Sequence, residues 1–195
     1  MFFESVSAEK LAINMRELSR RLGAPVGTVI DGAEALMKQL TLAAKPSYVA
    51  IRVKLKRECG AIYLGATRSE SKSLAKLCSE SDECFVLVAT LGVGVDRLIL
   101  KSANISPRDA FVIDAMADAL IEALCDYAEA RVCEGLSTTG RFSPGYGDLE
   151  LSLGKEIILL TDAERTLGIK LTLGGLMVPK KSVNAIIAIR NEKND

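Results

Sequence analysis

The sequence predicts an α+β fold, because helical and strand-like segments are mixed along the chain without the regular alternation of a parallel βαβ sheet. Apolar residues make up 49% of the 195 positions, which is enough for a sizeable core. Residues 107–133 carry the signals of one long helix. No repeat, low-complexity tract or linker interrupts the sequence, so we expect residues 1–195 to form a single domain.

Outside the long helix, the chain shows both helical and extended patterns. In the segment 48–57 apolar residues occupy every second position, which is typical of a half-buried strand. The run 84–92 is almost wholly apolar, as in a central strand. Apolar residues at three- and four-residue steps indicate amphipathic helices. The predicted elements are helices over 8–22, 28–43, 69–78 and 151–167, and strands over 48–57, 61–67, 84–92 and 183–189.

The composition argues against several classes of function. With 25 basic and 25 acidic residues, the chain offers no broad attraction for nucleic acid or an anionic membrane. No apolar run reaches the ~20 residues of a membrane helix, and we expect no export signal at the N-terminus. Five cysteines without a CxxC pair fit a reducing cytoplasm better than a disulfide framework or a zinc site. The absence of histidine removes histidine-based catalytic triads and an axial imidazole for a haem or corrin.

A glycine-rich stretch at 90–98, TLGVGVDRL, lies between a predicted strand and a helix. The same order occurs in dinucleotide-binding folds, which use the pattern G-x-G-x-x-G. The third glycine of that pattern would fall at Arg97, and the stretch lacks a βαβ frame. We therefore interpret it as a tight strand-to-helix turn rather than as a nucleotide site.

The long helix begins with a cap signature. Ser106 is placed to cap it, Pro107 occupies its first turn, and Asp109 is an acid at the third position. Carboxylates then recur at four-residue steps, at Asp114, Asp118, Glu122 and Asp126. Two interpretations are open. We favour a solvated acidic face; the other is that at least one carboxylate meets a cation from outside the helix, such as Arg141, a cationic ligand or a basic partner.

The turn RFSPGYGD follows this helix. Pro144 and Gly145 predict a sharp reversal of the chain. Proline pre-sets φ at the second position of a four-residue turn, and glycine accepts the positive φ that a type II turn needs at the third. A chain reversal alone does not require Arg141 or Tyr146. A guanidinium can bind a carboxylate or phosphate through two parallel hydrogen bonds, and tyrosine adds a ring and a hydroxyl. The segment is either a ligand-binding loop or a structural turn.

Four segments, in their order along the chain, resemble the activation domain of vitamin B12-dependent methionine synthase. They are the long acidic helix, R-x-x-x-G-Y at 141–146, DAERTLGIKLT at 162–172 and MVPKKSV at 177–183. The resemblance is good over 85–189 and loose over the first 80 residues. It implies a C-shaped fold around a twisted antiparallel sheet with flanking helices, and S-adenosylmethionine bound in a shallow groove.

The resemblance also implies candidate site residues. Arg141 would grip the ligand carboxylate, and backbone groups near Ser143 and Gly145 would hold the ligand. Tyr146 would lie near the corrin, and Glu122 corresponds to a glutamate of the family's long helix. No catalytic side chain and no metal ligand follows from it, because the role of the fold is to position a methyl donor.

The function implied is that of a stand-alone, shortened reactivation subunit, a component of a methyltransferase rather than a complete enzyme. It would bind S-adenosylmethionine and support reductive methylation of cob(II)alamin on a separate chain, either a cobalamin-dependent methionine synthase core or another corrinoid protein. A flavodoxin-like or ferredoxin-like protein would donate the electron. A chain without histidine cannot supply a cobalt imidazole, so the cobalamin would belong to the partner.

Two alternatives stay open. Two ligand contacts of the family, an acid near the domain start and a tyrosine after the last strand, have no counterpart here. Their absence favours a non-catalytic module that docks on a corrinoid protein without binding S-adenosylmethionine. The acidic row could instead belong to a metal-dependent enzyme with Asp114, Asp118 or Glu122 as ligands, although carboxylates on successive turns of one helix make a poor cage.

Overall fold

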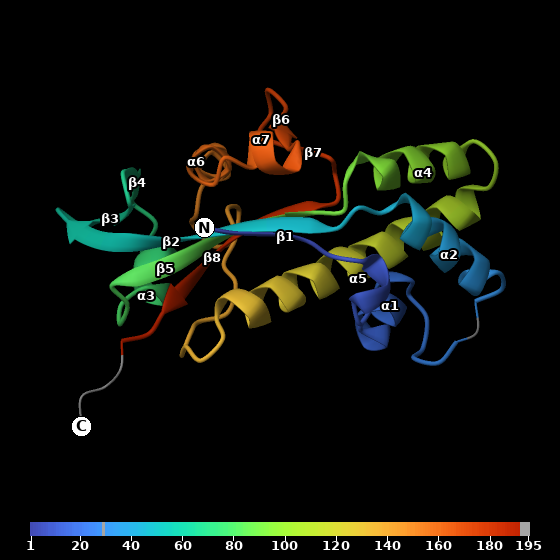
Figure 1. Ribbon diagram of the computed structural model, residues 1–195, viewed down its shortest axis with the longest axis horizontal. Coiled ribbons are helices and arrows are strands. Elements are labelled where there is room, and N and C mark those ends of the chain that lie inside the picture. Colours follow the sequence, from blue (N-terminus) through green and yellow to red (C-terminus); the bar gives the residue numbers. More distant parts are fainter. Residues whose placement is uncertain (29, 192–195) are drawn as a thin grey trace.

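The computed structural model describes residues 1–28 and 30–191, which are organised around a curled antiparallel sheet (Figure 1). Its main path runs β4-β3-β2-β5-β8, and β1 pairs with β2 as well. Neighbouring strands are antiparallel throughout. The strands are β1 (Phe2–Ser5), β2 (Ser47–Glu58), β3 (Ala61–Leu64), β4 (Thr67–Ser69), β5 (Glu83–Thr90) and β8 (Ser182–Ile189). The predicted α+β class and the antiparallel sheet are confirmed.

Helices lie on both sides of this sheet (Figure 1). The long helix α5, with α1 and α2, packs on one face, and α6 and α7 pack on the other. A small hairpin, β6 (Lys170–Leu171) with β7 (Met177–Val178), extends the α6–α7 side. The helices are α1 (Met15–Arg21), α2 (Ala33–Ala43), α3 (Lys72–Leu77), α4 (Val93–Ala103), α5 (Pro107–Val132), α6 (Leu153–Leu160) and α7 (Ala163–Leu167), and a 3-10 turn, η1, spans Ala8–Lys10.

The central strand β5 is buried on both faces, which explains its continuous apolar sequence. Phe85 and Leu87 belong to the core cluster that contains α5. The alternate residues Val86 and Val88 belong to the second cluster, beneath α6 and α7. Side chains alternate across a strand, so an apolar residue at every position feeds two cores from one strand.

The predicted long helix is confirmed as α5, which spans 26 residues. The Ser106 side chain accepts a hydrogen bond from the backbone N–H of Asp109 at 3.2 Å, and Pro107 occupies the first turn. Fourteen α5 residues are buried, among them Ile113 and Leu124 with no exposed surface. Burial of this length of helix fixes the direction of its acidic row relative to the sheet.

Two predicted helices are interrupted in the structure. The prediction over 8–22 was wrong for its first half: η1 is followed by extended chain, and α1 begins after Asn14. The Asn14 side chain accepts from the backbone N–H groups of Arg16 and Glu17, which caps the helix there. The predicted helix over 151–167 breaks into α6 and α7 at Asp162, whose φ of 52° lies in the left-handed region.

Three further boundaries differ from the prediction. The helix expected over 28–43 begins only at Ala33, because its N-cap Gly32 adopts a left-handed φ of 74°. The strand expected over 61–67 divides into β3 and β4 around Gly65. The strand β1 was not predicted, since its four residues FFES are too few to show a period.

The glycine-rich stretch at 90–98 is a tight connection between β5 and α4, as expected. Gly92 caps α4 with a φ of 80° and a ψ of 160°, a conformation that favours glycine. At Gly94 a Cβ atom would lie 2.2 Å from the carbonyl oxygen of Ala43, so the helix could not approach α2 with a larger residue. Within residues 1–28 and 30–191, no helix combines the length and apolarity that crossing a membrane requires.

Candidate functional site

The acidic row of α5 is paired with cations from other segments. Arg141 contacts three carboxylates: Nη1 lies 2.7 Å from Glu129, and Nη2 lies 2.8 Å from Asp126 and 3.2 Å from Glu122. The solvated acidic face that we favoured is therefore wrong for this part of the helix. The other interpretation, a cation supplied from outside the helix, holds.

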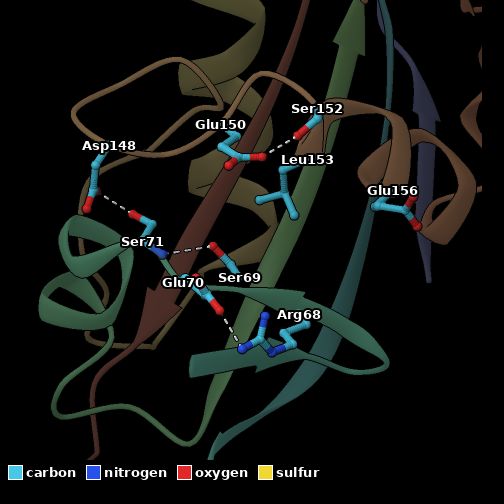
Figure 2. Close-up of a pocket in the computed structure, with 9 residues that line it drawn as sticks. All are labelled: Arg68, Ser69, Glu70, Ser71, Asp148, Glu150, Ser152, Leu153 and Glu156. Atoms are coloured by element: carbon cyan, nitrogen blue, oxygen red, sulfur yellow. Dashed lines mark hydrogen bonds and ion pairs between the residues drawn. The ribbon is translucent and has the colours of Figure 1, made fainter. Parts of the chain in front are cut away.

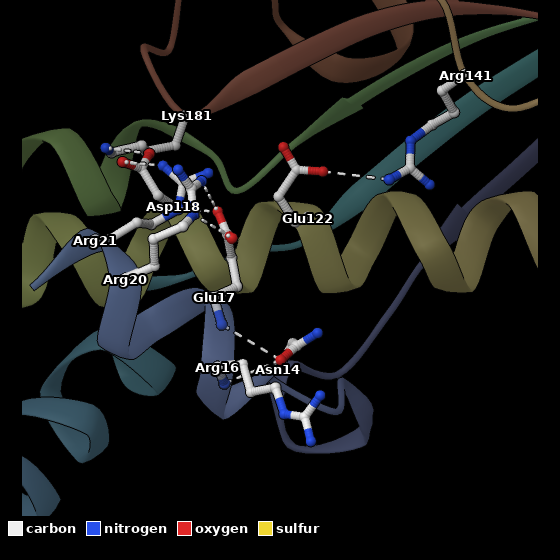
Figure 3. Close-up of polar contacts among 9 residues, drawn as sticks. All are labelled: Asn14, Arg16, Glu17, Arg20, Arg21, Asp118, Glu122, Arg141 and Lys181. Carbon is white, nitrogen blue, oxygen red and sulfur yellow. Dashed lines mark hydrogen bonds and ion pairs between the residues drawn. The ribbon is translucent and has the colours of Figure 1, made fainter. Parts of the chain in front are cut away.

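The N-terminal half of the row is paired as well (Figure 3). Lys181 Nζ lies 2.9 Å from Asp114 and 2.6 Å from Asp118, and its side chain is only 11% exposed. Arg21 of α1 contacts Asp118 at 3.0 Å and Glu17 at 2.8 Å. These contacts occupy the carboxylates that a metal would need. Among the residues that the structure describes, no group of three candidate ligands is arranged to hold a metal ion.

The turn that carries Arg141 is fixed to the sheet at its start. The backbone N–H of Phe142 donates to the carbonyl of Ile186 at 2.9 Å, and the N–H of Ile186 returns a bond to Phe142 at 2.8 Å. The N–H of Tyr146 donates to the carbonyl of Ser143 at 3.0 Å, which closes the turn. Gly145 has a φ of 91°, as its predicted turn position requires. The reversal predicted at Pro144 and Gly145 is confirmed.

The end of the turn is fixed to α3 by Asp148 (Figure 2). Its carboxylate accepts hydrogen bonds from the Ser71 hydroxyl at 2.6 Å and from the backbone N–H groups of Lys72 and Ser73 at 2.8 and 3.0 Å. The bond from Ser71, followed by those from Ser73, lowers the pKa of Asp148 well below its ordinary range. Gly147 packs so closely that a Cβ there would lie 2.7 Å from Ser73 Oγ. Both ends of the turn are therefore held.

A pocket of about 320 Å³ lies between this turn and α5. Tyr146 forms part of its wall; the residue is 59% exposed, and its ring meets that of Phe142 edge to face at 6.1 Å. The lining residues are Glu122, Asp126, Glu129, Gly140, Arg141, Ser143, Tyr146 and Val183. Four of the five residues predicted for the site, Glu122, Arg141, Ser143 and Tyr146, thus meet at one cavity.

Gly145, the fifth predicted residue, does not line the pocket. Its backbone N–H donates to the carbonyl of Leu149 at 2.7 Å, and a Cβ on it would lie 2.9 Å from the Leu151 side chain. Its place in the structure is that of a turn residue. Sequence reasoning did not select Asp126 and Glu129 for the site, although Asp126 belongs to the four-residue row and Glu129 lies one turn further on.

The pocket carries a surplus of negative charge. Its charged lining consists of three carboxylates and one guanidinium, a net charge of minus two when all are ionised. Burial alone would lower the pKa of Arg141, but the hydrogen bond to Asp126 and the neighbouring anionic groups outweigh burial and raise the pKa above its ordinary value. Arg141 therefore stays charged, and the charged lining of the pocket has a net negative charge.

Comparisons with known proteins bear on the fold. No protein-family model matches the chain, and no curated protein matches it in sequence. Among solved structures, the chain matches a crystal structure described as the MetH reactivation domain bound to AdoHcy, with a TM-score of 0.70. The two share 18% sequence identity, and the match covers 100% of this chain and 79% of that chain. The chain thus has the fold of that reactivation domain, in agreement with the resemblance seen in its sequence.

Proposed function

We propose that this chain binds S-adenosylmethionine in the pocket between α5 and the turn at Arg141, and that it assists the reactivation of a cobalamin-dependent methionine synthase. One observation carries the proposal: the R-x-x-x-G-Y turn meets the acidic face of α5 at a pocket, in a chain whose fold matches a reactivation domain described as bound to AdoHcy. S-adenosylmethionine differs from AdoHcy by one methyl group and the positive charge that it confers on sulfur.

The pocket residues suit such a ligand. Its sulfonium and ammonium groups are cations, and the carboxylates of Glu122, Asp126 and Glu129 surround the space that would receive them. The exposed ring of Tyr146 supplies an apolar wall at the surface, where a partner's corrin could approach. S-adenosylmethionine would supply the methyl group, and cobalamin on the partner would receive it. The work of this chain would be to hold and orient the donor, since positioning alone lowers a transfer barrier substantially.

The proposed partners follow from the same assignment. The cobalamin would be carried by a methionine synthase core or another corrinoid protein, and a flavodoxin-like or ferredoxin-like protein would provide the electron. All five cysteines are unpaired, which is compatible with the reducing cytoplasm that we propose as the location. The chain would act as a component of the methyltransferase.

A second function is favoured by one observation. Arg141, the expected grip for a ligand carboxylate, already contacts three carboxylates of α5. A closed set of ion pairs is what a structural element of a docking module would also have. In that case the chain would bind a corrinoid protein and leave S-adenosylmethionine unbound.

Titration calorimetry with S-adenosylmethionine separates the two. The first function predicts saturable binding that weakens in Glu122→Gln and is unchanged in Glu134→Gln, because Glu134 is an exposed acid outside the pocket. The chain should be titrated alone and together with a cobalamin-loaded methionine synthase core. Absence of binding in both conditions contradicts the first function. Capture of the cobalamin-loaded core without ligand binding is the result that the docking module predicts.

A further inference from the structure

The guanidinium of Arg141 has few donors to spare for a ligand. It offers five N–H groups; Nη1 is engaged by Glu129, and Nη2 is shared by Asp126 and Glu122. Its side chain is 21% exposed, while that of Asp126 is 70% exposed and is the most exposed of the three acids. A ligand carboxylate that approached Arg141 would share the guanidinium with these three acids and would be repelled by their charge.

The charge of the pocket is local. The whole chain has a net charge of zero, with 25 basic and 25 acidic residues. The lining residues besides Glu122, Asp126, Glu129 and Arg141 are a glycine, a serine, a tyrosine and a valine, which add no charge at neutral pH. Lys181, which also faces α5, is engaged with Asp114 and Asp118. Within the lining of the pocket, the surplus of two negative charges has no counter-charge.

We propose that this pocket selects its ligand by net positive charge and that a ligand carboxylate is dispensable; this inference rests on the proposed function. Asp126 and Glu129 set the selectivity, and Arg141 is a positioning residue that holds the carboxylates around one cavity. Three S-adenosyl compounds that differ mainly in net charge can test this. Decarboxylated S-adenosylmethionine carries two positive charges, S-adenosylmethionine carries a net one, and AdoHcy is neutral overall. Affinity should fall in that order.

The difference in affinity between successive compounds follows from Coulomb's law. A unit charge about 7 Å from two net opposite charges in a water-exposed site changes the affinity by about tenfold at low salt. The Debye length falls to about 4 Å in 0.5 M salt, so the affinities of successive compounds should differ there by only about twofold. A pocket in which Arg141 grips the ligand carboxylate predicts the opposite order for the first two compounds, because the decarboxylated one lacks the gripped group.

The test is titration calorimetry of the three compounds against four proteins. They are the parent chain, Asp126→Asn, the double variant Asp126→Asn/Glu129→Gln, and the control Glu134→Gln. In the double variant the charged lining becomes neutral, so the three affinities should converge while AdoHcy binding changes little. Structural damage would weaken all three compounds alike. Asp126→Asn changes a largely exposed side chain, so it keeps the test valid if the double variant fails to fold. It should reduce the differences in affinity among the three compounds without abolishing them. The control Glu134→Gln should leave these differences unchanged.

The outcomes separate this inference from the proposed function. Weaker binding of the decarboxylated compound than of S-adenosylmethionine overturns the inference and leaves the proposed function standing. Equal affinities for the three compounds in the parent chain also overturn the inference alone. Failure of all three to bind, with or without the cobalamin-loaded core, overturns the proposed function and the inference together.

Discussion

Replacing Arg141 with alanine tests the pairing that organises the pocket. The change leaves the carboxylates of Glu122, Asp126 and Glu129 without their shared cation. Ion pairs at the surface contribute ~0.2–1 kcal/mol each. The pair with Glu129, whose side chain is 26% exposed, should be the strongest, and the pair with Asp126, 70% exposed, the weakest.

A second contribution comes from repulsion within α5. Once Arg141 is gone, Asp126 lies one turn from an uncompensated acid on either side, at Glu122 and Glu129. Like charges at these spacings destabilise a helix by ~0.2–0.5 kcal/mol per pair. Together with the lost pairs, we expect Arg141→Ala to lower the free energy of unfolding by about 1–3 kcal/mol. For a domain of this length that corresponds to a fall in Tm of about 3–10 °C.

Calorimetric unfolding at low and high salt checks this expectation. In 1 M salt the destabilisation should shrink by about half or more, because the Debye length falls to about 3 Å. Arg141→Lys, which keeps the charge and loses the fork, should recover part of the stability. Adding Asp126→Asn to Arg141→Ala should recover part of it through reduced repulsion. A Tm for Arg141→Ala within 1 °C of the parent at low salt would refute the account of this cluster.

Three further predictions concern the rest of the chain. Asp148→Asn should free the turn from α3 and increase amide exchange at Ser71–Ser73. Hydrogen bonding lowers the pKa of Asp148, so the carboxylate stabilises the fold fully above the ordinary aspartate pKa of about 4. This stabilisation is lost as the pH falls through the lowered pKa, where the stabilities of variant and parent should converge. Leu124→Ala, at a fully buried position of α5, should cost about 2–5 kcal/mol in chemical denaturation. An aromatic disulfide reagent should label only the exposed Cys59 in the folded chain. Burial shields the other thiols and raises the pKa of Cys78 to about 11 and that of Cys125 to about 12. Labelling of all five thiols before unfolding would contradict this.

Local signals explain why parts of the fold could be predicted. The cap at Ser106 and Pro107 placed the start of α5 correctly, because its hydrogen bond is made within three residues. The apolar run at 84–92 placed β5 at the centre of the sheet. Element ends that depend on left-handed residues other than glycine were missed, as at Asp162, because such a conformation has no reliable sequence signal.

The candidate site could be predicted only in part, because its partners are distant in sequence. Arg141 and Tyr146 stood out as excess chemistry in a turn, and the structure places both at the pocket. The pairing of Lys181 with Asp118 joins residues 63 positions apart, and the bond from Ser71 to Asp148 spans 77. No periodicity along the chain encodes such contacts. The favoured interpretation of the acidic row, a solvated face, was therefore wrong, and the alternative that named Arg141 as a possible cation was right.

The most direct measurement of the central claim is where S-adenosylmethionine binds. A titration followed by backbone amide NMR reports both binding and location, because amides near the ligand shift. The account predicts saturable shifts concentrated at Gly140, Arg141, Ser143 and Tyr146 and on the facing turn of α5 around Asp126. An absence of shifts, or shifts confined to surfaces away from this pocket, would contradict it.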